Sequence, residues 1–460
     1  MITFMDYIVQ AFGASSDWNP DNSYSALTAT SDSLLSFETP KTLSLHASSL
    51  SSNNFASSYR LSTLGHIDGS ISYLYTSHAL GQVAARSPSI PLRNLVRGYR
   101  DLRLPQVPVS GVWELPTGRK PTLLYATLAL PPPSVLNALY VRRINPETLL
   151  SLSLYSKSST TPVLNGGSPP ASVLAHLQRD TGQYSVEGLL STDSALLGAR
   201  GLWNFGVSPP PAAPPSTPAD FDLKIPPSTD AYLQYRNRLA SKPSLLSAGA
   251  EFYYSPLSHV IGMSTGLRFT TLAPHIMPTP SHSSRGKPFT GTAASLLLPS
   301  NISHSSFPYT MTLTLNPLVG GIASTYSVRP TPNLALSSRF DFNFYSWESR
   351  YVLGAEIWRG SRGSRSISPE NPVYWAKERL RGWFSPEEMA LKEERFERED
   401  ENVLKVGVDD GWSVKALWTG RVKALLVSAG VTVCPEPRKV GADAGTPWKG
   451  SFGVTVAYST

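Results

Sequence analysis

A serine between two glycines matches the spacing of a catalytic motif. In the run GMSTG, Ser264 lies between Gly262 and Gly266, as the nucleophile does in a nucleophile elbow. That motif needs a sharp turn between a strand and a helix, whereas the residues that follow here, LRFTTL, are typical of a strand. We therefore expect no hydrolase chemistry at Ser264.

The remaining reactive residues do not form a recognisable site either. The eight histidines are scattered without metal-ligand spacing, Cys434 is the single cysteine, and no glycine-rich phosphate loop is present. One cysteine cannot form an intrachain disulfide. The sequon at Asn301 is short enough to occur by chance. The sequence predicts a protein that is not an enzyme, with no catalytic residue, no metal and no cofactor.

The C-terminal stretch WKGSFGVTVAYST shows strict alternation, which is typical of a strand. Its apolar face is formed by Trp448, Phe452, Val454, Val456 and Tyr458, and its polar face by Lys449, Ser451, Thr455 and Ser459. Trp448 and Tyr458 are ten residue steps apart, and at a rise of about 3.3 Å per residue and a tilt of about 40° they lie about 25 Å apart along a membrane normal. This is the height of the apolar band on a transmembrane barrel. The closing strand of a soluble β-sandwich would show the same alternation.

Composition permits a transmembrane barrel and argues against a helical membrane protein. Charged residues make up 16% of the chain, mean hydropathy is −0.14, and no apolar run approaches 18 residues. The mitochondrial anion channel is a barrel of 19 strands. That number of strands, at about ten residues each, would use about 190 positions, so more than half of this chain would form turns, loops and insertions. The net charge of +7 is spread along the chain without a basic block, which gives no indication of nucleic-acid binding.

The N-terminal residues predict a short amphipathic helix. Phe4, Ile8 and Phe12 recur at four-residue spacing and would form one apolar stripe. The run MITFMDYIVQAF lacks both the charged start of a secretory signal and the arginine-rich face of a matrix presequence. In a barrel, we expect residues 1–22 to lie in the lumen.

Alternation predicts strands over most of the remaining chain. In the segment from Leu334 to Trp347, Phe340 and Phe342 would face lipid while Arg339 and Asp341 would face the lumen. The predicted strands are a weak first strand over 33–40, then 70–76, 122–130, two strands around the turn at 145–146, 171–177, 183–191, 195–205, 309–316, 322–328, 334–347, 350–358, 411–419 and 422–433.

Four segments interrupt this pattern. Residues 87–122 form a loop rich in proline and arginine, and residues 206–230 form a proline-rich insertion that is followed by a second one over 274–287. Residues 360–410 carry most of the local charge. A capping box at Ser385 and Glu388 predicts a polar helix there, so we interpret 360–410 as a charged, partly helical insertion.

Several runs together resemble the fungal mitochondrial distribution and morphology protein 10 family. They are MDYIVQAF and NSYSALTATS near the start, SYLY, TLTLNPLVGGIASTYS, FDFNFYSWES, the SAG of the strand 422–433, and the terminal AYST. The resemblance implies a single all-β transmembrane antiparallel β-barrel over 1–460, of the mitochondrial porin type with about 19 strands. An N-terminal lumenal helix and long loop insertions complete this expectation.

The resemblance also implies a place and two roles. The place is the mitochondrial outer membrane at contact sites with the endoplasmic reticulum. One role is in the tether between the two organelles, where the barrel would anchor lipid-transfer proteins and support phospholipid exchange and mitochondrial shape. The other is the late assembly of outer-membrane barrels, including the translocase pore, beside the sorting and assembly machinery. The expected partners are these proteins and the lipid bilayer, with no nucleic acid. The alternatives are a small-solute pore of the anion-channel type and a soluble sandwich.

The matching runs indicate candidate site residues. The SYLY match makes Tyr73 and Tyr75 candidates for the tether interface, and the STYS match makes Tyr326 a candidate for contact with the assembly machinery. These tyrosines could instead belong to the aromatic girdle of a barrel. The terminal pattern of Ser451, Gly453, Val456 and Tyr458 resembles the sorting signal of mitochondrial outer-membrane barrels.

Overall fold

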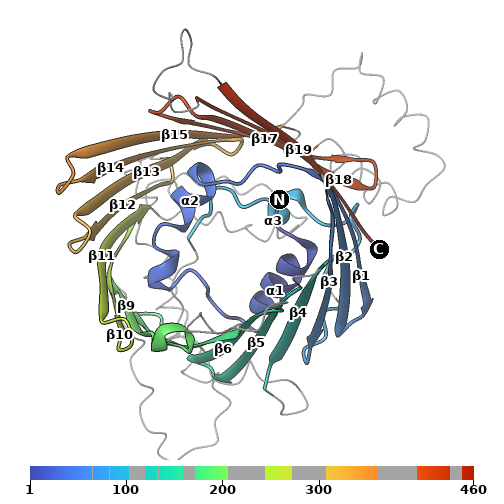
Figure 1. The fold of residues 1–460 in the computed structure, drawn as a ribbon, viewed down its shortest axis with the longest axis horizontal. Helices are drawn as coiled ribbons and strands as arrows, with labels where there is room; N and C mark the ends of the chain where they lie inside the picture. The colour runs from blue at the N-terminus through green and yellow to red at the C-terminus, as the bar shows by residue number, and fades with distance from the viewer. Residues whose placement is uncertain are drawn as a thin grey trace, which may run out of the picture.

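A computed structural model describes residues 1–64, 66–81, 83–102, 120–131, 134–158, 171–205, 244–271, 307–359, 401–435 and 448–460. These residues form a closed barrel of 19 strands (Figure 1). The strands are β1 (Leu43–Ser52), β2 (Phe55–Leu64), β3 (His66–Thr76), β4 (Thr122–Leu130), β5 (Val135–Asn145), β6 (Thr148–Lys157), β7 (Ala171–Asp180), β8 (Tyr184–Ser191), β9 (Leu197–Phe205), β10 (Ser244–Ser255), β11 (Val260–Thr271), β12 (Tyr309–Asn316), β13 (Gly321–Thr331), β14 (Leu334–Asn343), β15 (Glu348–Arg359), β16 (Asn402–Asp409), β17 (Val414–Val422), β18 (Leu425–Pro435) and β19 (Trp448–Ser459). The predicted barrel and its strand number are confirmed.

The barrel closes through one parallel pair. Successive strands run antiparallel, so with an odd number of strands the first and the last point in the same direction. β1 therefore pairs with β19 in parallel, over six residue pairs from Leu43 with Val454 to Ser48 with Ser459. Parallel pairing is slightly less stable per residue than antiparallel pairing. This seam is the one departure from the expected antiparallel sheet in the described strands.

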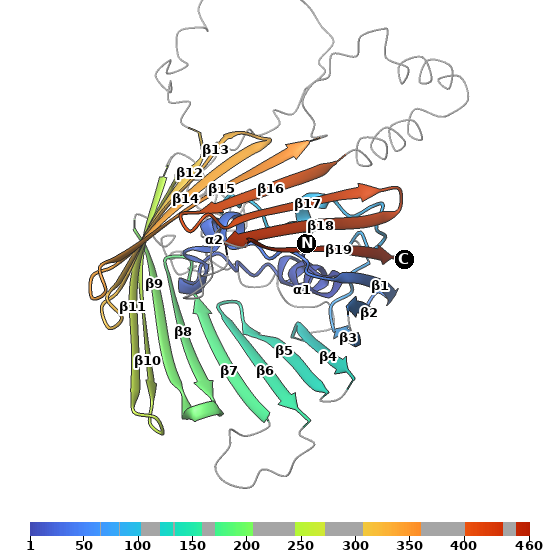
Figure 2. The same cartoon turned by 45° about the horizontal axis from the view of Figure 1, so that its top comes forward.

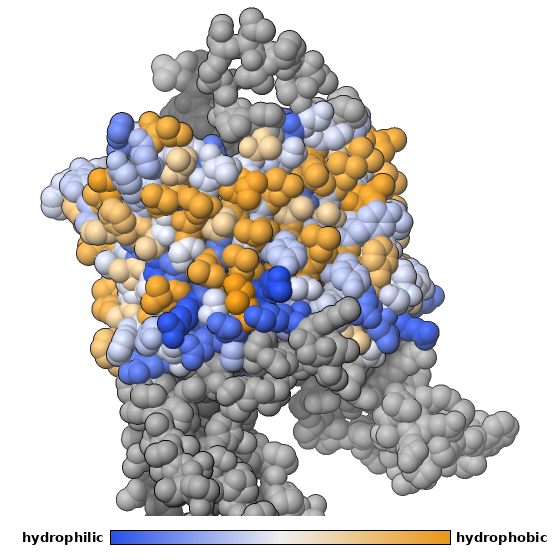
Figure 3. All heavy atoms as spheres, turned by 90° about the horizontal axis from the view of Figure 1, so that it is seen from below, coloured by the Kyte–Doolittle hydropathy of each residue, from blue (hydrophilic) through white to orange (hydrophobic). Residues whose placement is uncertain are grey.

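Alternation places polar side chains inside and apolar side chains outside. On β12, Thr310 and Thr312 are buried toward the lumen, while Met311 and Leu313 are exposed on the outer wall. Apolar side chains cover much of the outer wall in Figure 3. The same parity turns Arg339 inward, where it pairs with Asp32, and leaves Phe340 exposed outside, as predicted.

Several strand predictions are missing or wrong, because none covers β1, β2 or β10 and the strand predicted over 334–347 ends at Asn343. The weak strand over 33–40 does not form, because residues Ala29–Leu35 fold as helix α2 with Leu34 and Leu35 buried on one side. The insertion predicted over 360–410 ends earlier, since Asn402–Asp409 form β16. The charge over 360–410 predicts an exposed insertion, yet the side chain of Lys405 in this stretch is buried in an ion pair. Residues 360–400 and the proline-rich insertions at 206–230 and 274–287 lie outside the described residues.

Two chain segments fold into the lumen (Figures 1 and 2). The first is the N-terminal segment, residues 1–42, with α1 (Phe4–Ser15), the short helix η1 (Tyr24–Ala26) and α2. The second is residues 77–102, which follow β3 and contain α3 (Leu92–Leu95). The predicted loop over 87–122 is thus partly a lumenal element. None of the helices in the described residues is long and apolar enough to cross a membrane.

The lumen contains its own hydrophobic core. α1 begins at a capping box of Thr3 and Asp6, and its apolar face buries Met5, Ile8 and Phe12. This face packs with wall residues Ala56, Leu74 and Leu123 and with Leu80, Ile90, Leu92 and Leu95 of the 77–102 segment. The predicted apolar stripe therefore buries itself against the inside of the barrel and against the second lumenal segment.

A buried ion pair joins both lumenal segments to the wall. Lys405 on β16 lies with its Nζ 3.2 Å from Oε2 of Glu356 on β15, and both side chains are 3% exposed. Lys405 also donates to the carbonyl of Ser33, at 2.9 Å, and to that of Arg97. Trp358 donates to Oε1 of Glu356 at 2.6 Å. One lysine thus binds the wall, the N-terminal segment and the 77–102 segment together.

We predict that Lys405→Met destabilises the barrel by about 3–5 kcal/mol, because it leaves the Glu356 carboxylate buried without its cation. Adding Glu356→Gln should recover most of this loss, since the amide oxygen can still accept from Trp358. Urea unfolding of the refolded chain in detergent measures the free energy of unfolding. Equal stability of the single and double variants would contradict this account of the pair.

Candidate functional site

The terminal strand places the four predicted sorting-signal residues on two faces. Ser451 and Gly453 face the lumen, whereas Val456 and Tyr458 belong to the outer face, where Tyr458 is exposed. In the closed barrel both edges of β19 are paired, with β18 on one side and β1 on the other. The strand is therefore free to pair with another protein only while the seam is open.

The backbone passes directly over Gly453 just before it enters β1. A Cβ at Gly453 would lie 2.5 Å from Pro40 C and from Thr42 N, and Val454 N donates to Thr42 O at 3.1 Å. Gly430 on β18 is the register partner of Gly453, and a Cβ there would lie 2.7 Å from Pro40 Cδ. The two glycines form a gap in the inner wall through which residues 39–42 reach the seam.

The same close approach recurs along the path of the N-terminal segment. From residue 24 onward this segment follows the inner wall from β10 to β19 (Figure 1). Its residues lie against wall glycines in the pairs Tyr24 with Gly249, Leu27 with Gly266, Leu34 and Leu35 with Gly354, Phe37 with Gly407, Thr39 and Pro40 with Gly430, and Pro40 and Thr42 with Gly453. At these positions the wall lacks a side chain, and the segment lies directly on it.

The 77–102 segment holds the end of the terminal strand. Ser459 N donates to Ser87 Oγ at 2.6 Å, and Ser459 Oγ donates to Ala85 O at 2.7 Å. Ser87 N donates back to Ser459 O at 3.1 Å. Both serines are buried. The seam is therefore held from inside the lumen at both of its ends, by residues 39–42 and by residues 85–87.

A buried polar cluster fixes the middle of the N-terminal segment to the opposite wall. Asn22 donates to Asp180 Oδ1 at 2.5 Å and accepts from Asn204 Nδ2 at 2.8 Å. Ser23 donates to Glu187 Oε1 at 2.6 Å. Asn22, Ser23 and their three wall partners are each at most 6% exposed. The buried polar groups of such a network all have hydrogen-bond partners in only one arrangement of the segment against the wall. The network therefore fixes the segment in register with β7–β9.

Tyr24 shows what Ser264 does in this structure. Its hydroxyl lies 2.7 Å from Ser264 Oγ, and Ser264 sits within β11 rather than on a turn before a helix. Burial raises the pKa of Tyr24, so its hydroxyl stays protonated. The serine of the GMSTG run is thus a wall contact of the N-terminal segment. The described residues contain no group of three or more His, Cys, Asp or Glu side chains arranged to hold a metal.

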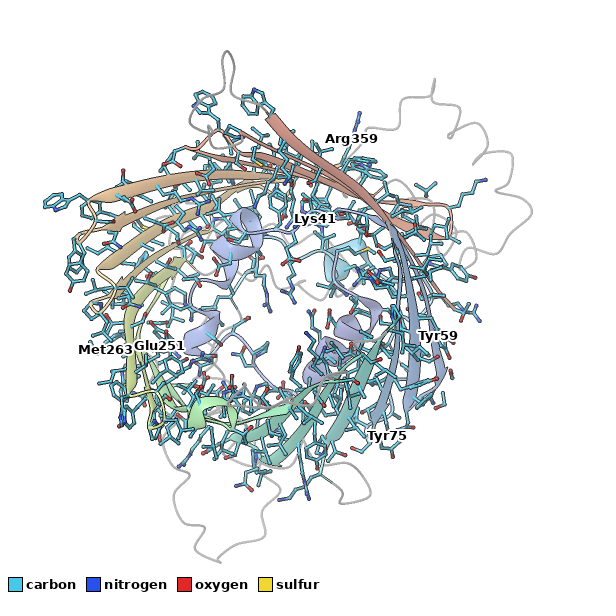
Figure 4. All side chains as sticks on the ribbon, in the orientation of Figure 1. Lys41, Tyr59, Tyr75, Glu251, Met263 and Arg359 are labelled. Carbon is cyan, nitrogen blue, oxygen red and sulfur yellow. The ribbon has the colours of Figure 1, made fainter. Side chains whose placement is uncertain are left out.

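The two tyrosines of the SYLY run belong to an aromatic patch on the outer wall. Tyr73 and Tyr75 are 46% and 52% exposed on β3. The Tyr73 ring stacks on Phe55 of β2 with centroids 5.8 Å apart, and its hydroxyl lies 3.5 Å from that of Tyr59. Tyr59 and Tyr75 point away from the barrel in Figure 4. We call Phe55, Tyr59, Tyr73 and Tyr75 the β2–β3 aromatic patch.

Tyr326 lies elsewhere on the outer wall, at the middle of β13 rather than at a strand end. Its ring is 6.0 Å from that of Tyr309, and its register partner on β14 is Ser338. Ser324 is exposed on the same face of β13. Tyr309 begins β12 and its ring lies 6.0 Å from that of Phe269 on β11, so Tyr326 adjoins a row of aromatic side chains on the outer wall. The structure does not bring Tyr326 together with Tyr73 and Tyr75.

Sequence reasoning missed the residues that hold the seam from inside. Gly430 had a signal, because an isolated glycine within a strand often marks the close approach of another backbone. Gly354, Gly407, Gly430 and Gly453 all fall on the lumen-facing parity of their strands. Ser87 and Asn22 carried no such signal, because their partners are distant in sequence.

Comparison with known proteins identifies the family. The family model described as mitochondrial distribution and morphology protein 10 matches residues 1–383 and 376–460. The chain belongs to this family. Membership implies a role in mitochondrial distribution and morphology, and together with the barrel it fits a protein of the mitochondrial outer membrane.

Relatives with the same name match the chain over its whole length. The proteins named mitochondrial distribution and morphology protein 10 from Emericella nidulans and Coccidioides immitis are each 45% identical, with all of both chains covered. The protein of that name from Ajellomyces capsulatus is 41% identical over 517 residues, again covering both chains fully. The family and the barrel indicate a structural protein rather than an enzyme.

We predict that Gly453→Leu slows closure of the barrel, because the new side chain must displace residues 40–42 and overpacking costs about 1–3 kcal/mol or more. Gly430→Leu, outside the terminal strand, should have the same effect. Import into isolated mitochondria, followed by the appearance of a protease-resistant form, measures closure.

Gly450→Leu is the matched control, because a Cβ at Gly450 meets nothing within 4 Å. It should close at the normal rate. If Gly430→Leu closes normally while Gly453→Leu does not, Gly453 acts through recognition of the terminal strand and not through the gap.

Proposed function

We propose that the chain is a non-enzymatic anchor and adaptor in the mitochondrial outer membrane. It takes part in the tether between the endoplasmic reticulum and mitochondria, where it holds lipid-transfer subunits and supports phospholipid exchange. It also acts with the sorting and assembly machinery in late assembly of outer-membrane barrels, including the translocase pore. The observation that carries this proposal is the full-length family match in a barrel whose lumen holds two fixed chain segments.

The two lumenal segments narrow the barrel, although cavities of about 970 and 1730 Å³ remain beside them, and this favours an anchor over a small-solute pore. A conducting barrel leaves a water-filled channel, whereas here two segments cross the lumen and share a hydrophobic core with the wall. The buried contacts of Asn22, Ser23 and Lys405 fix these segments in place. Opening a wide channel would break all of them at once.

The outer wall supports contact with two separate partners. The β2–β3 aromatic patch is close to the seam and combines exposed rings with hydroxyl groups, a composition common at protein interfaces. On the other side of the barrel, Tyr326, Ser324 and Ser338 place hydroxyl groups midway along the strands. Hydroxyl groups at membrane depth form hydrogen bonds with neighbouring protein. We assign the first surface to the tether and the second to the assembly machinery.

Carbonate extraction of mitochondria, followed by affinity purification in digitonin, tests the proposal. We expect the chain to stay in the membrane and to co-purify with tether and assembly subunits. Release into the soluble fraction would contradict the membrane anchor. Retention without either set of subunits, together with solute conductance in planar bilayers, would favour the pore.

We predict that the double change Tyr73→Ser and Tyr75→Ser releases the tether subunits and leaves the barrel inserted. It removes two exposed rings and no lumenal contact. The matched control is Tyr155→Ser with Tyr351→Ser, two outer-wall tyrosines that are 45% and 44% exposed. Quantitative co-purification measures the effect. Loss of insertion in the Tyr73 and Tyr75 variant would assign these residues to the membrane girdle instead.

A further inference from the structure

A cavity of about 970 Å³ lies inside the barrel next to the seam. Its lining comes from the start of α1, from residues 35–42, and from inward side chains of both seam strands and their neighbours. It also includes Asp409 and Ser413, at the turn between β16 and β17, so the cavity reaches the rim of the barrel. This volume is at the upper end of the range of small-molecule sites. We call this space the seam chamber.

The side chains that line the seam chamber are predominantly positive. Five Lys and Arg residues line it, namely Lys41, Arg60, Arg339, Arg350 and Lys415, against two carboxylates, Glu38 and Asp409. The strands around the seam explain this imbalance. β17, β18, β19, β1 and β2 are neighbours in the sheet, and their residues include no Asp or Glu. The opposite wall differs, because Asp180, Glu187 and Glu251 lie on β7, β8 and β10.

Three of the five cations have no carboxylate partner in the part of the chain that the structure describes. Arg339 pairs with Asp32 and Asp341, and Arg350 pairs with Asp409. Lys41, Arg60 and Lys415 make no ion pair with any described residue. Lys41 lies inside the barrel in Figure 4. Cations that converge on an enclosed space repel one another less when an anion lies between them.

The positions of these cations follow from the register. Lys415 is the partner of Thr432 on β18, and Thr432 is the partner of Ser451 on β19. Thr39 Oγ1 lies 2.6 Å from Thr432 Oγ1, which brings Lys41 over this row. Arg60 is the partner of His46, next to the seam. The cations therefore approach one space from a lumenal segment and from two strands on opposite sides of the seam.

The rest of the lining combines hydroxyl groups with an apolar surface. Ser44, Ser428, Thr432, Ser451 and Thr455 bring hydroxyl groups from the wall, and Phe4, Leu35, Phe37, Ile90 and Leu95 bring apolar side chains from the lumenal segments. Hydroxyl and ammonium groups donate hydrogen bonds to phosphate oxygens. We propose that the seam chamber binds a phosphate-bearing anion, either free phosphate or the headgroup of a phospholipid.

The first experiment uses the full chain purified in dodecyl maltoside, which contains no phosphate. Inorganic phosphate and dihexanoylphosphatidic acid are titrated separately, and ³¹P line broadening measures binding. Broadening of both probes supports a free-anion site, and broadening of the lipid alone supports a headgroup site. Broadening of neither overturns the proposal.

The test variant carries Lys41→Gln, Arg60→Gln and Lys415→Gln. The matched control carries Arg142→Gln, Lys157→Gln and Lys423→Gln, which remove the same charges from exposed positions outside the chamber. We expect the test variant to bind at least about tenfold more weakly and the control to bind as the unmodified chain does. Equal binding by both variants overturns the proposal.

Lys41→Gln alone covers the case in which the triple variant does not fold, because Lys41 lies outside the strands. Lys41→Gln should weaken binding by a smaller factor than the triple variant does. Higher ionic strength should also weaken binding to the unmodified chain. Binding unchanged by both Lys41→Gln and salt would contradict a site in the seam chamber.

Discussion

The parallel pairing of β1 with β19 is the contact on which the rest of the structure depends. It spans six residue pairs, and without it every other strand pair would belong to an open sheet with two free edges. The barrel supports this seam from within. Residues 39–42 pass through the gap at Gly430 and Gly453, and Ser87 holds Ser459 at the other end. The contacts that support the closed seam and those that place the lumenal segments are therefore made by the same residues.

This coupling gives the terminal strand two physical roles at different times. While the seam is open, the edge of β19 offers unpaired backbone groups to another strand. Once residues 39–42 lie over Gly453, that edge pairs with β1 and the lumenal face of the strand is covered. A small residue at position 453 serves both states, because it leaves the edge accessible first and the crossing chain unobstructed afterwards. The two roles need not compete.

The molecule separates its chemistry between two surfaces. The lumen contains the buried ion pair of Lys405 with Glu356, the polar cluster around Asn22 and the cationic seam chamber. The outer wall contains apolar side chains with two distinct groups of aromatic and hydroxyl residues. Partners that bind the β2–β3 aromatic patch would contact strands adjacent to the seam, so the proposed tether surface and the residues that hold the seam are neighbours in the sheet.

The sequence by itself determined which side of β12, β14 and β19 faces inward, because a period of two divides polar from apolar positions in these strands. It did not predict β1, β2 or β10. The apolar stripe of α1 was equally visible, since Phe4, Ile8 and Phe12 repeat at helical spacing. Both patterns are local, and so are the runs that indicated the family.

The strand predicted over 33–40 failed because Leu34 and Leu35 pack on Gly354, a contact made across about 320 residues of chain. β16 was missed because the charge over 360–410 predicts an exposed insertion, and only the fold places Glu356 beside Lys405. Only the tertiary structure decided the path of the lumenal segments, the support of the seam and the charge of its chamber, because each joins residues whose separation in sequence says nothing about their separation in space.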